Sequence, residues 1–76
     1  MQLRIVTSER EMLSTEVDSV ILPGENGQME ILPGHTMLLS ILQAGEIQYS
    51  NASKTDHVLI TSGCVEVKDD KILALV

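Results

Sequence analysis

The sequence predicts an all-β fold, a sandwich or barrel of short antiparallel strands that occupies the single domain 1–76. Three observations lead to this prediction. Short segments with alternating apolar and polar residues follow one another closely, turn-forming residues separate them, and no segment keeps a helical apolar period beyond one turn. A chain of this length has one modest core, so that contact with a partner would add to its stability.

The core of such a domain has to be aliphatic. Hydrophobic residues make up 43% of the chain, and they are almost all Leu, Ile, Val and Met, with one Tyr and neither Phe nor Trp. β-Branched Val and Ile suit pleated strands, so this composition favours a sheet whose shape depends on many small contacts.

The N-terminal segments predict three strands. Residues 3–6 alternate and then meet the polar break at 7–9, which indicates a strand that leaves into a turn. Residues 10–15 and 16–22 predict two more strands. The residues around Thr7 could also begin a helix, but the apolar positions that follow do not keep a helical spacing, and the strand interpretation is preferred.

The stretch 21–42 contains both prolines and three of the five glycines, and its turns are the predicted working surface. Ile-Leu-Pro-Gly occurs twice, at 21–24 and 31–34, which we take as a coincidence of two turns. Between the copies, Asn26-Gly27 suits the two-residue turn of a β-hairpin, although Glu25 and Gln28 make a longer loop equally possible.

Further strands are predicted in the C-terminal half. The apolar run 37–42 is typical of a strand buried on both faces, or alternatively of a helical turn. Residues 46–50 form the clearest strand, and 51–55 a polar loop. A strand is predicted at 56–62, with Val58 and Ile60 on one side, and another at 64–68, with Val65 and Val67 inward. A turn at Asp69-Asp70 then leads to a last predicted strand at 71–76, which is apolar on both faces.

Charge and cysteine content exclude several classes of protein. The net charge of −6 repels phosphate backbones and anionic lipids, and the five basic residues are dispersed, so we expect no nucleic-acid partner. A single cysteine makes no internal disulfide, which favours a reducing compartment. With no apolar run near the ~18 residues of a membrane span and no secretory signal, we expect a soluble protein without bilayer insertion.

Candidate chemistry is sparse. His35, His57 and Cys64 are metal-ligand types without metal-site spacing, and no nucleophile elbow or phosphate-binding glycine loop occurs, so we expect no metal, cofactor or catalytic residue. Cys64 is predicted to be a small buried residue. The Pro-Gly turns are predicted to display Gln28, Glu30 and His35 together at one end, as an interaction surface.

Several motifs, in order along the whole chain, resemble the ATP synthase epsilon subunit family of the F-type rotary ATPases. Gly-Gln-Met-Glu-Ile-Leu-Pro-Gly-His at 27–35 is similar to the family's Gly-x-x-Gly-Ile-Leu-Pro-Gly-His. Leu-Leu-Ser at 38–40, Gly45, Ser-Gly-Cys-Val-Glu-Val at 62–67 and Ile-Leu-Ala-Leu at 72–75 continue the match. Glu30, Met37 and Cys64 depart from the family pattern.

The resemblance implies an antiparallel β-sandwich that serves as a non-catalytic rotor component of the central stalk. Such a subunit links the gamma subunit to the membrane c-ring and couples ion flow to ATP synthesis, at the cytoplasmic face of an energy-transducing membrane. Thr7, His35 and Ser40 match positions that face gamma. Gln28 matches a commonly acidic position that faces the polar loops of the c-ring. A charge contact with a ring arginine would therefore be weakened, or taken over by the neighbouring Glu30.

Two further expectations accompany this assignment. The chain closes at Val76, where most relatives continue into a helical hairpin, so we expect it to support assembly without restraining ATP hydrolysis or binding ATP. Exposed strand edges make weak self-association of the isolated domain possible. The alternative function is a free-standing small β domain that binds a ligand or acts as an adaptor.

Overall fold

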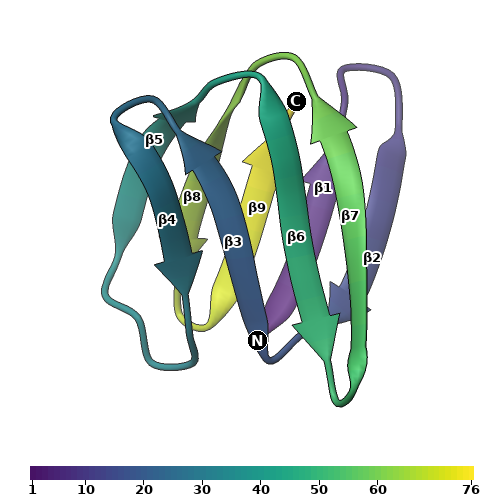
Figure 1. Ribbon diagram of the computed structural model, residues 1–76, viewed down its shortest axis with the longest axis vertical. Coiled ribbons are helices and arrows are strands. Elements are labelled where there is room, and N and C mark those ends of the chain that lie inside the picture. Colours follow the sequence, from purple (N-terminus) through teal and green to yellow (C-terminus); the bar gives the residue numbers. More distant parts are fainter.

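The computed structural model describes all 76 residues and contains nine strands in two packed layers (Figure 1). One layer, the five-stranded sheet, has the strand order β2-β1-β9-β8-β5, and the other, the four-stranded sheet, has the order β4-β3-β6-β7. A single pair, Gly24 with Leu42, joins β3 to β5 at the corner between the layers. The strands are β1 Gln2–Val6, β2 Glu11–Glu16, β3 Ser19–Gly24, β4 Gly27–Ile31, β5 Leu38–Leu42, β6 Gly45–Asn51, β7 Lys54–Ile60, β8 Gly63–Lys68 and β9 Lys71–Leu75. The predicted β-sandwich is confirmed.

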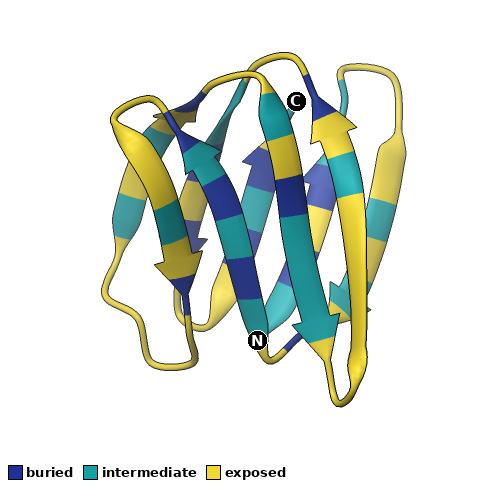
Figure 2. Cartoon of the chain, viewed as in Figure 1, coloured by how far each residue is buried: buried dark blue, intermediate teal, exposed yellow.

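The core lies between the two sheets and is wholly aliphatic, as predicted. Figure 2 shows that buried positions alternate with less buried ones along strands such as β3. Full burial of one such side chain contributes about 1.5–3 kcal/mol, so the core is the main source of stability. Tyr49, the one aromatic residue, packs against its periphery. The thirteen buried hydrophobic residues are Leu3, Ile5, Val17, Val20, Leu22, Ile31, Leu42, Ile47, Ile60, Val65, Val67, Ile72 and Ala74.

Alternation along the strands decides which side chains reach this core. In β8, Val65 and Val67 are buried while Glu66 between them is exposed, as the sequence pattern predicts. The first and last residues of the strands agree less well with the prediction. The predicted strand 16–22 is wrong at its start, because the chain breaks at Val17 and Asp18 before β3. The predicted loop 51–55 shrinks to a tight turn, because Asn51 already pairs with Lys54 across the β6–β7 hairpin.

The β3–β4 hairpin is centred one residue earlier than Asn26-Gly27. Gly24 pairs with Gly27, so the two turn residues are Glu25 and Asn26, and Gly27 is the residue with positive φ (131°). Gly24 permits this close crossing, since a Cβ there would lie 2.6 Å from the carbonyl oxygen of Gly27. The first Pro-Gly pair thus ends strand β3, whereas the second lies in the loop after β4.

The β8–β9 hairpin turns at Asp69-Asp70, as predicted. Both residues are left-handed, with φ of 52° and 59°, and Lys68 pairs with Lys71 on either side. Two successive left-handed residues make the type I′ turn that matches the twist of a hairpin, and aspartate tolerates that conformation better than most residues.

One strand pair departs from the predicted antiparallel arrangement. β1 pairs with β9 in parallel, with Leu3 opposite Ile72 and Ile5 opposite Ala74. The first and last strands are therefore neighbours in the five-stranded sheet, and β1 fills the position between β2 and β9 (Figure 1). Local alternation contains no signal for such a distant pairing.

Candidate interaction surface

The outer face of the five-stranded sheet carries exposed apolar side chains, and we call Leu39, Ile41 and Leu75 the apolar face. Their exposed fractions are 77%, 58% and 46%. Ile41 pairs with Cys64 and Cys64 with Leu75, so these three residues form one cross-strand row over β5, β8 and β9. Leu39 lies on the same side of β5 as Ile41, two residues before it.

The apolar face corrects the prediction for residues 37–42. The run forms a strand and not a helical turn, but only one side of it is buried, because β5 lies in a layer with the core on one side alone. Leu42 reaches the core, while Leu39 and Ile41 remain outside. Met37, just before the strand, is also exposed (73%).

Cys64 is half-buried and lies outside the core, whereas the sequence predicts a small buried residue. Val65 and Val67 take the inward positions of β8, so Cys64 points to the outer face. The thiol therefore belongs to the apolar face, between Ile41 and Leu75.

Charged residues surround the apolar face. Glu66 separates Leu39 from Leu73 across β5, β8 and β9. Arg4, next along in β1, forms an ion pair with Glu11 of β2 (Nε–Oε1 2.7 Å). At the far end of the sheet, Lys68 and Lys71 of the β8–β9 hairpin pair with each other and carry no ion pair. These residues give an apolar patch with a polar rim, the usual anatomy of a protein interface.

The predicted c-ring residues lie on the other side of the molecule. Gln28 and Glu30 lie in β4, where they pair with Pro23 and Ile21 of β3. Their alternation with the buried Ile31 directs them to the outer face of the four-stranded sheet. Gln28, beside the β3–β4 turn, lies at the opposite end of β4 from the loop that contains His35, whereas Glu30 lies next to the end where that loop begins. The predicted grouping of all three residues at one end therefore does not hold for Gln28.

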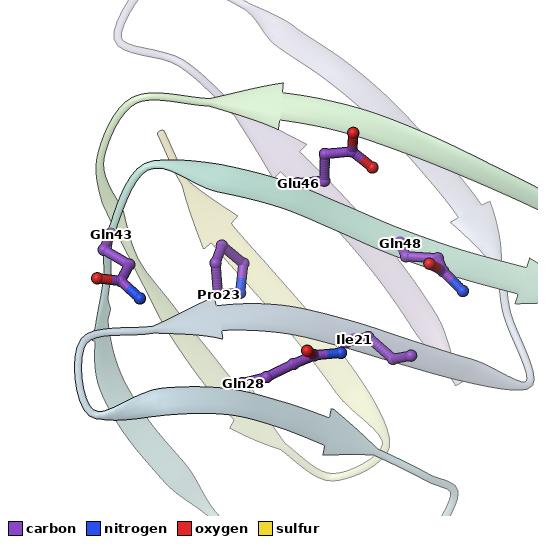
Figure 3. Close-up of a pocket in the computed structure, with 6 residues that line it drawn as sticks. All are labelled: Ile21, Pro23, Gln28, Gln43, Glu46 and Gln48. Atoms are coloured by element: carbon purple, nitrogen blue, oxygen red, sulfur yellow. The ribbon is translucent and has the colours of Figure 1, made fainter.

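Gln28 borders a shallow polar hollow of about 450 Å³ on this outer face (Figure 3). Beside it, the Nδ1 atom of His57 lies 2.8 Å from Oε2 of Glu46, in the middle of the exposed edge strand β7. The lining of the hollow contains three side-chain amides and one carboxylate, but no nucleophile with an adjacent base. Its residues are Ile21, Pro23, Gln28, Gln43, Glu46 and Gln48.

Of the predicted gamma-side residues, Thr7 and His35 lie at opposite ends of the sandwich. β1 begins beside the β8–β9 turn, where the N–H of Gln2 donates to the carbonyl of Asp70 (3.0 Å). The loop that contains His35 lies at this same end, because Gly34 also bonds to Asp70. Thr7 follows the far end of β1 (Figure 1).

Thr7 has a structural part in its turn. Its hydroxyl oxygen accepts hydrogen bonds from the backbone N–H groups of Glu9 (3.2 Å) and Arg10 (3.1 Å). Ser40, the third predicted gamma-side residue, pairs with Val65 and points to the inner side of β5, where it is half-buried. Ser40 therefore does not belong to the apolar face.

No group of three or more His, Cys, Asp or Glu side chains is arranged to hold a metal ion. Every buried side-chain nitrogen or oxygen has a hydrogen-bond partner. Burial, and secondarily the charge of Asp56, raises the pKa of Tyr49 above its ordinary value, which keeps the phenol neutral. The structure contains no helix that could cross a membrane.

Comparisons with known proteins agree with this architecture. The ATP synthase delta/epsilon chain β-sandwich domain family matches residues 1–76. An ATP synthase epsilon chain of Syntrophotalea carbinolica is 43% identical over 76 residues, which are 100% of this chain and 55% of that protein. A Dehalococcoides mccartyi epsilon chain is 40% identical over 75 residues, 99% of this chain and 54% of that protein. The chain thus spans about half the length of the curated relatives that it matches.

Solved structures show the same fold. A chain of the Euglena gracilis mitochondrial ATP synthase (OSCP/F1/c-ring) superposes with a TM-score of 0.88 at 22% identity, over 96% of this chain and 48% of that one. A chain from the central stalk/c-ring of the Tetrahymena thermophila mitochondrial ATP synthase has a TM-score of 0.81 at 17% identity, over 99% and 61%. From the match of the whole sequence, together with this fold, the chain belongs to the β-sandwich domain family of the ATP synthase delta/epsilon chains.

Proposed function

We propose that the domain is a non-catalytic component of an ATP synthase central stalk, which binds the gamma subunit through its apolar face. The observation that carries this proposal is the exposure of Leu39, Ile41 and Leu75 on one outer face. Contiguous exposed apolar side chains with a polar rim are typical of protein interfaces. Burying one of these leucines against a partner would contribute about 1.5–3 kcal/mol.

Thr7 and His35 fit a partner that covers the whole length of the five-stranded sheet. Val6, which precedes Thr7, pairs with Leu75 of the apolar face. The loop that contains His35 leads into β5 at the other end. A gamma subunit laid along this sheet would therefore contact both residues at the two margins of the interface. Ser40 would contribute through the packing of β5 and not by direct contact.

The outer face of the four-stranded sheet is then available for the polar loops of the c-ring. Gln28 and Glu30 are exposed there, beside the hollow that Gln28 borders. Glu30 supplies the carboxylate for a basic ring residue. Since the two outer faces point away from each other, one small domain can contact both partners at once. This arrangement supports a role in the coupling of ion flow to ATP synthesis at the membrane surface.

A reconstitution experiment tests the proposal. The chain is added to a bacterial complex of gamma subunit and c-ring that lacks its own epsilon subunit, and binding is followed by co-sedimentation. We expect stoichiometric binding that a full-length epsilon chain of the same bacterium competes away. The absence of co-sedimentation would contradict the proposal, and a small molecule that co-purifies with the chain would instead support the ligand-binding alternative.

A further inference from the structure

The loop at residues 32–37, which we call the His35 loop, connects the two sheets and is exposed throughout. It contains a β-turn in which the N–H of His35 donates to the carbonyl of Leu32 (3.1 Å). Pro33 and Gly34 occupy the central positions, and Gly34 has a φ of 83°. Proline followed by a left-handed glycine is the pattern of a type II turn.

One hydrogen bond ties the His35 loop to the rest of the protein. The N–H of Gly34, at the centre of the turn, donates to Oδ1 of Asp70 at 2.9 Å, across 36 residues of sequence. The other hydrogen bonds of the loop stay inside it, including the contact between Nδ1 of His35 and the carbonyl of Thr36 (2.7 Å). Without the carboxylate of Asp70, the loop would be fixed only at its two ends.

Asp70 is itself rigidly placed. It is the second left-handed residue of the β8–β9 turn, and its carbonyl accepts the N–H of Gln2 at the start of β1 (3.0 Å). Its backbone therefore belongs to the five-stranded sheet, while its side chain reaches the loop that arrives from the four-stranded sheet. Asp69, its neighbour, has nearly the same φ (52°), but its side chain makes no hydrogen bond. The turn therefore does not require a side-chain contact, and the hydrogen bond to Gly34 distinguishes Asp70 from Asp69.

We propose that Asp70 is a positioning residue, whose carboxylate holds the His35 loop in the conformation that the gamma subunit binds. This inference rests on the proposed function. A loop that is already ordered loses less conformational entropy on binding, so an anchored loop binds more tightly than a free one. Asp70 holds the loop by its hydrogen bond to the N–H of Gly34, and this bond fixes the position of the adjacent His35 side chain.

Three variants separate the side chain from the turn. Glycine suits a φ near 59°, so Asp70→Gly keeps the turn and removes only the carboxylate. Asp69→Gly makes the same backbone change at a residue without the contact. Asp70→Asn keeps an acceptor oxygen and tolerates the left-handed conformation. Each variant is measured for exchange of the Gly34 amide hydrogen by NMR, for thermal unfolding, and for affinity for the gamma–c-ring complex.

We expect Asp70→Gly to accelerate Gly34 exchange about tenfold and weaken binding about fivefold, because the amide and the loop lose their one anchor. Asp70→Gly and Asp69→Gly should have the same melting temperature. Asp69→Gly should show wild-type Gly34 exchange and wild-type binding. Asp70→Asn should restore most of the protection of the Gly34 amide and most of the binding affinity. Equal exchange and binding in the two glycine variants would overturn the inference, as would a much lower melting temperature for Asp70→Gly alone.

Failure of the proposed function is distinguishable from failure of this inference. If the wild-type chain does not bind the gamma–c-ring complex, the proposed function is wrong, whatever the variants show. Gly34 exchange then still decides whether Asp70 anchors the loop. If the wild type binds and the two glycine variants bind equally well, the proposed function stands and the positioning role of Asp70 falls.

Discussion

Leu39 and Leu59 are equally exposed, at 77% each, but lie on the outer faces of opposite sheets. Leu39 belongs to the apolar face, with Ile41 beside it in β5. Leu59 lies in the edge strand β7 and pairs with the carboxylate-bearing Glu46. An equal loss of apolar area at the two positions should therefore have unequal consequences for a partner that recognises one face.

The first prediction uses this pair. Leu39→Ser should weaken binding to the gamma subunit about tenfold or more, because the lost burial of one leucine corresponds to about 1.5–3 kcal/mol. Leu59→Ser should change binding less than about twofold. Affinities are measured by calorimetric titration with isolated gamma subunit, and unfolding midpoints should stay equal. Stronger damage from Leu59→Ser would place the gamma interface on the other sheet.

The second prediction concerns His35, whose side chain is exposed in the His35 loop. His35→Ala should weaken gamma binding while the melting temperature stays the same, because the residue is exposed and is not part of the core. Circular dichroism melts and the same titration provide the two measurements. A melting temperature lowered by several degrees with unchanged gamma affinity would make His35 a structural residue.

The third prediction concerns the thiol of Cys64, half-buried between Ile41 and Leu75. A thiol reagent should modify the native protein more slowly than the denatured chain, and bound gamma subunit should slow modification at least about tenfold further, because the complex covers the apolar face. Mass spectrometry measures the rates. Rates that gamma does not change would mean that β8 lies outside the interface.

The fourth prediction follows from the raised pKa of Tyr49, whose causes are burial and then the nearby charge of Asp56. The folded protein holds the phenol proton more tightly than the unfolded chain, so this contribution to stability is complete below the unfolded pKa of about 10 and is lost as the pH rises through the folded pKa. Phenolate absorbance should show a midpoint above that of the denatured protein.

Two variants control the Tyr49 experiment. Tyr49→Phe should unfold with a weaker pH dependence in the alkaline range, since it has no proton to lose. Asp56→Asn should lower the Tyr49 midpoint only partly, because burial is the larger cause. A native midpoint equal to the denatured one would show that Tyr49 is more exposed than the packing at the core periphery indicates.

Much of the fold could be predicted because the strands are amphipathic. The alternation of residues 46–50 and 64–68 identifies strands β6 and β8 and their buried valines and isoleucine. The β3–β4 turn shifts by one residue because Gly24, Asn26 and Gly27 all tolerate tight turns, and only the cross-strand register chooses among them. The parallel β1–β9 pair could not be predicted, since it joins opposite ends of the chain.

The site was harder to predict than the fold. The run 37–42 has apolar residues at both alternating positions, which predicts a strand covered on both sides. The sequence cannot distinguish a side covered by the chain itself from one left for a partner, so the pattern predicts burial on both faces although Leu39 and Ile41 are exposed. Ser40 shows the same difficulty, because its inward direction depends on the register of β5 with β8.

The parallel pairing of β1 with β9 has a consequence for synthesis on the ribosome. The hairpin of β1 and β2 emerges before β9, which is the neighbour that completes its sheet and is translated only after β3 to β8. Until then one edge of β1 stays unpaired, with Leu3 and Ile5 lacking their cover from Ile72 and Ala74. Contacts of such high sequence separation form slowly, so the nascent chain is most open to misassociation while β9 has not yet emerged.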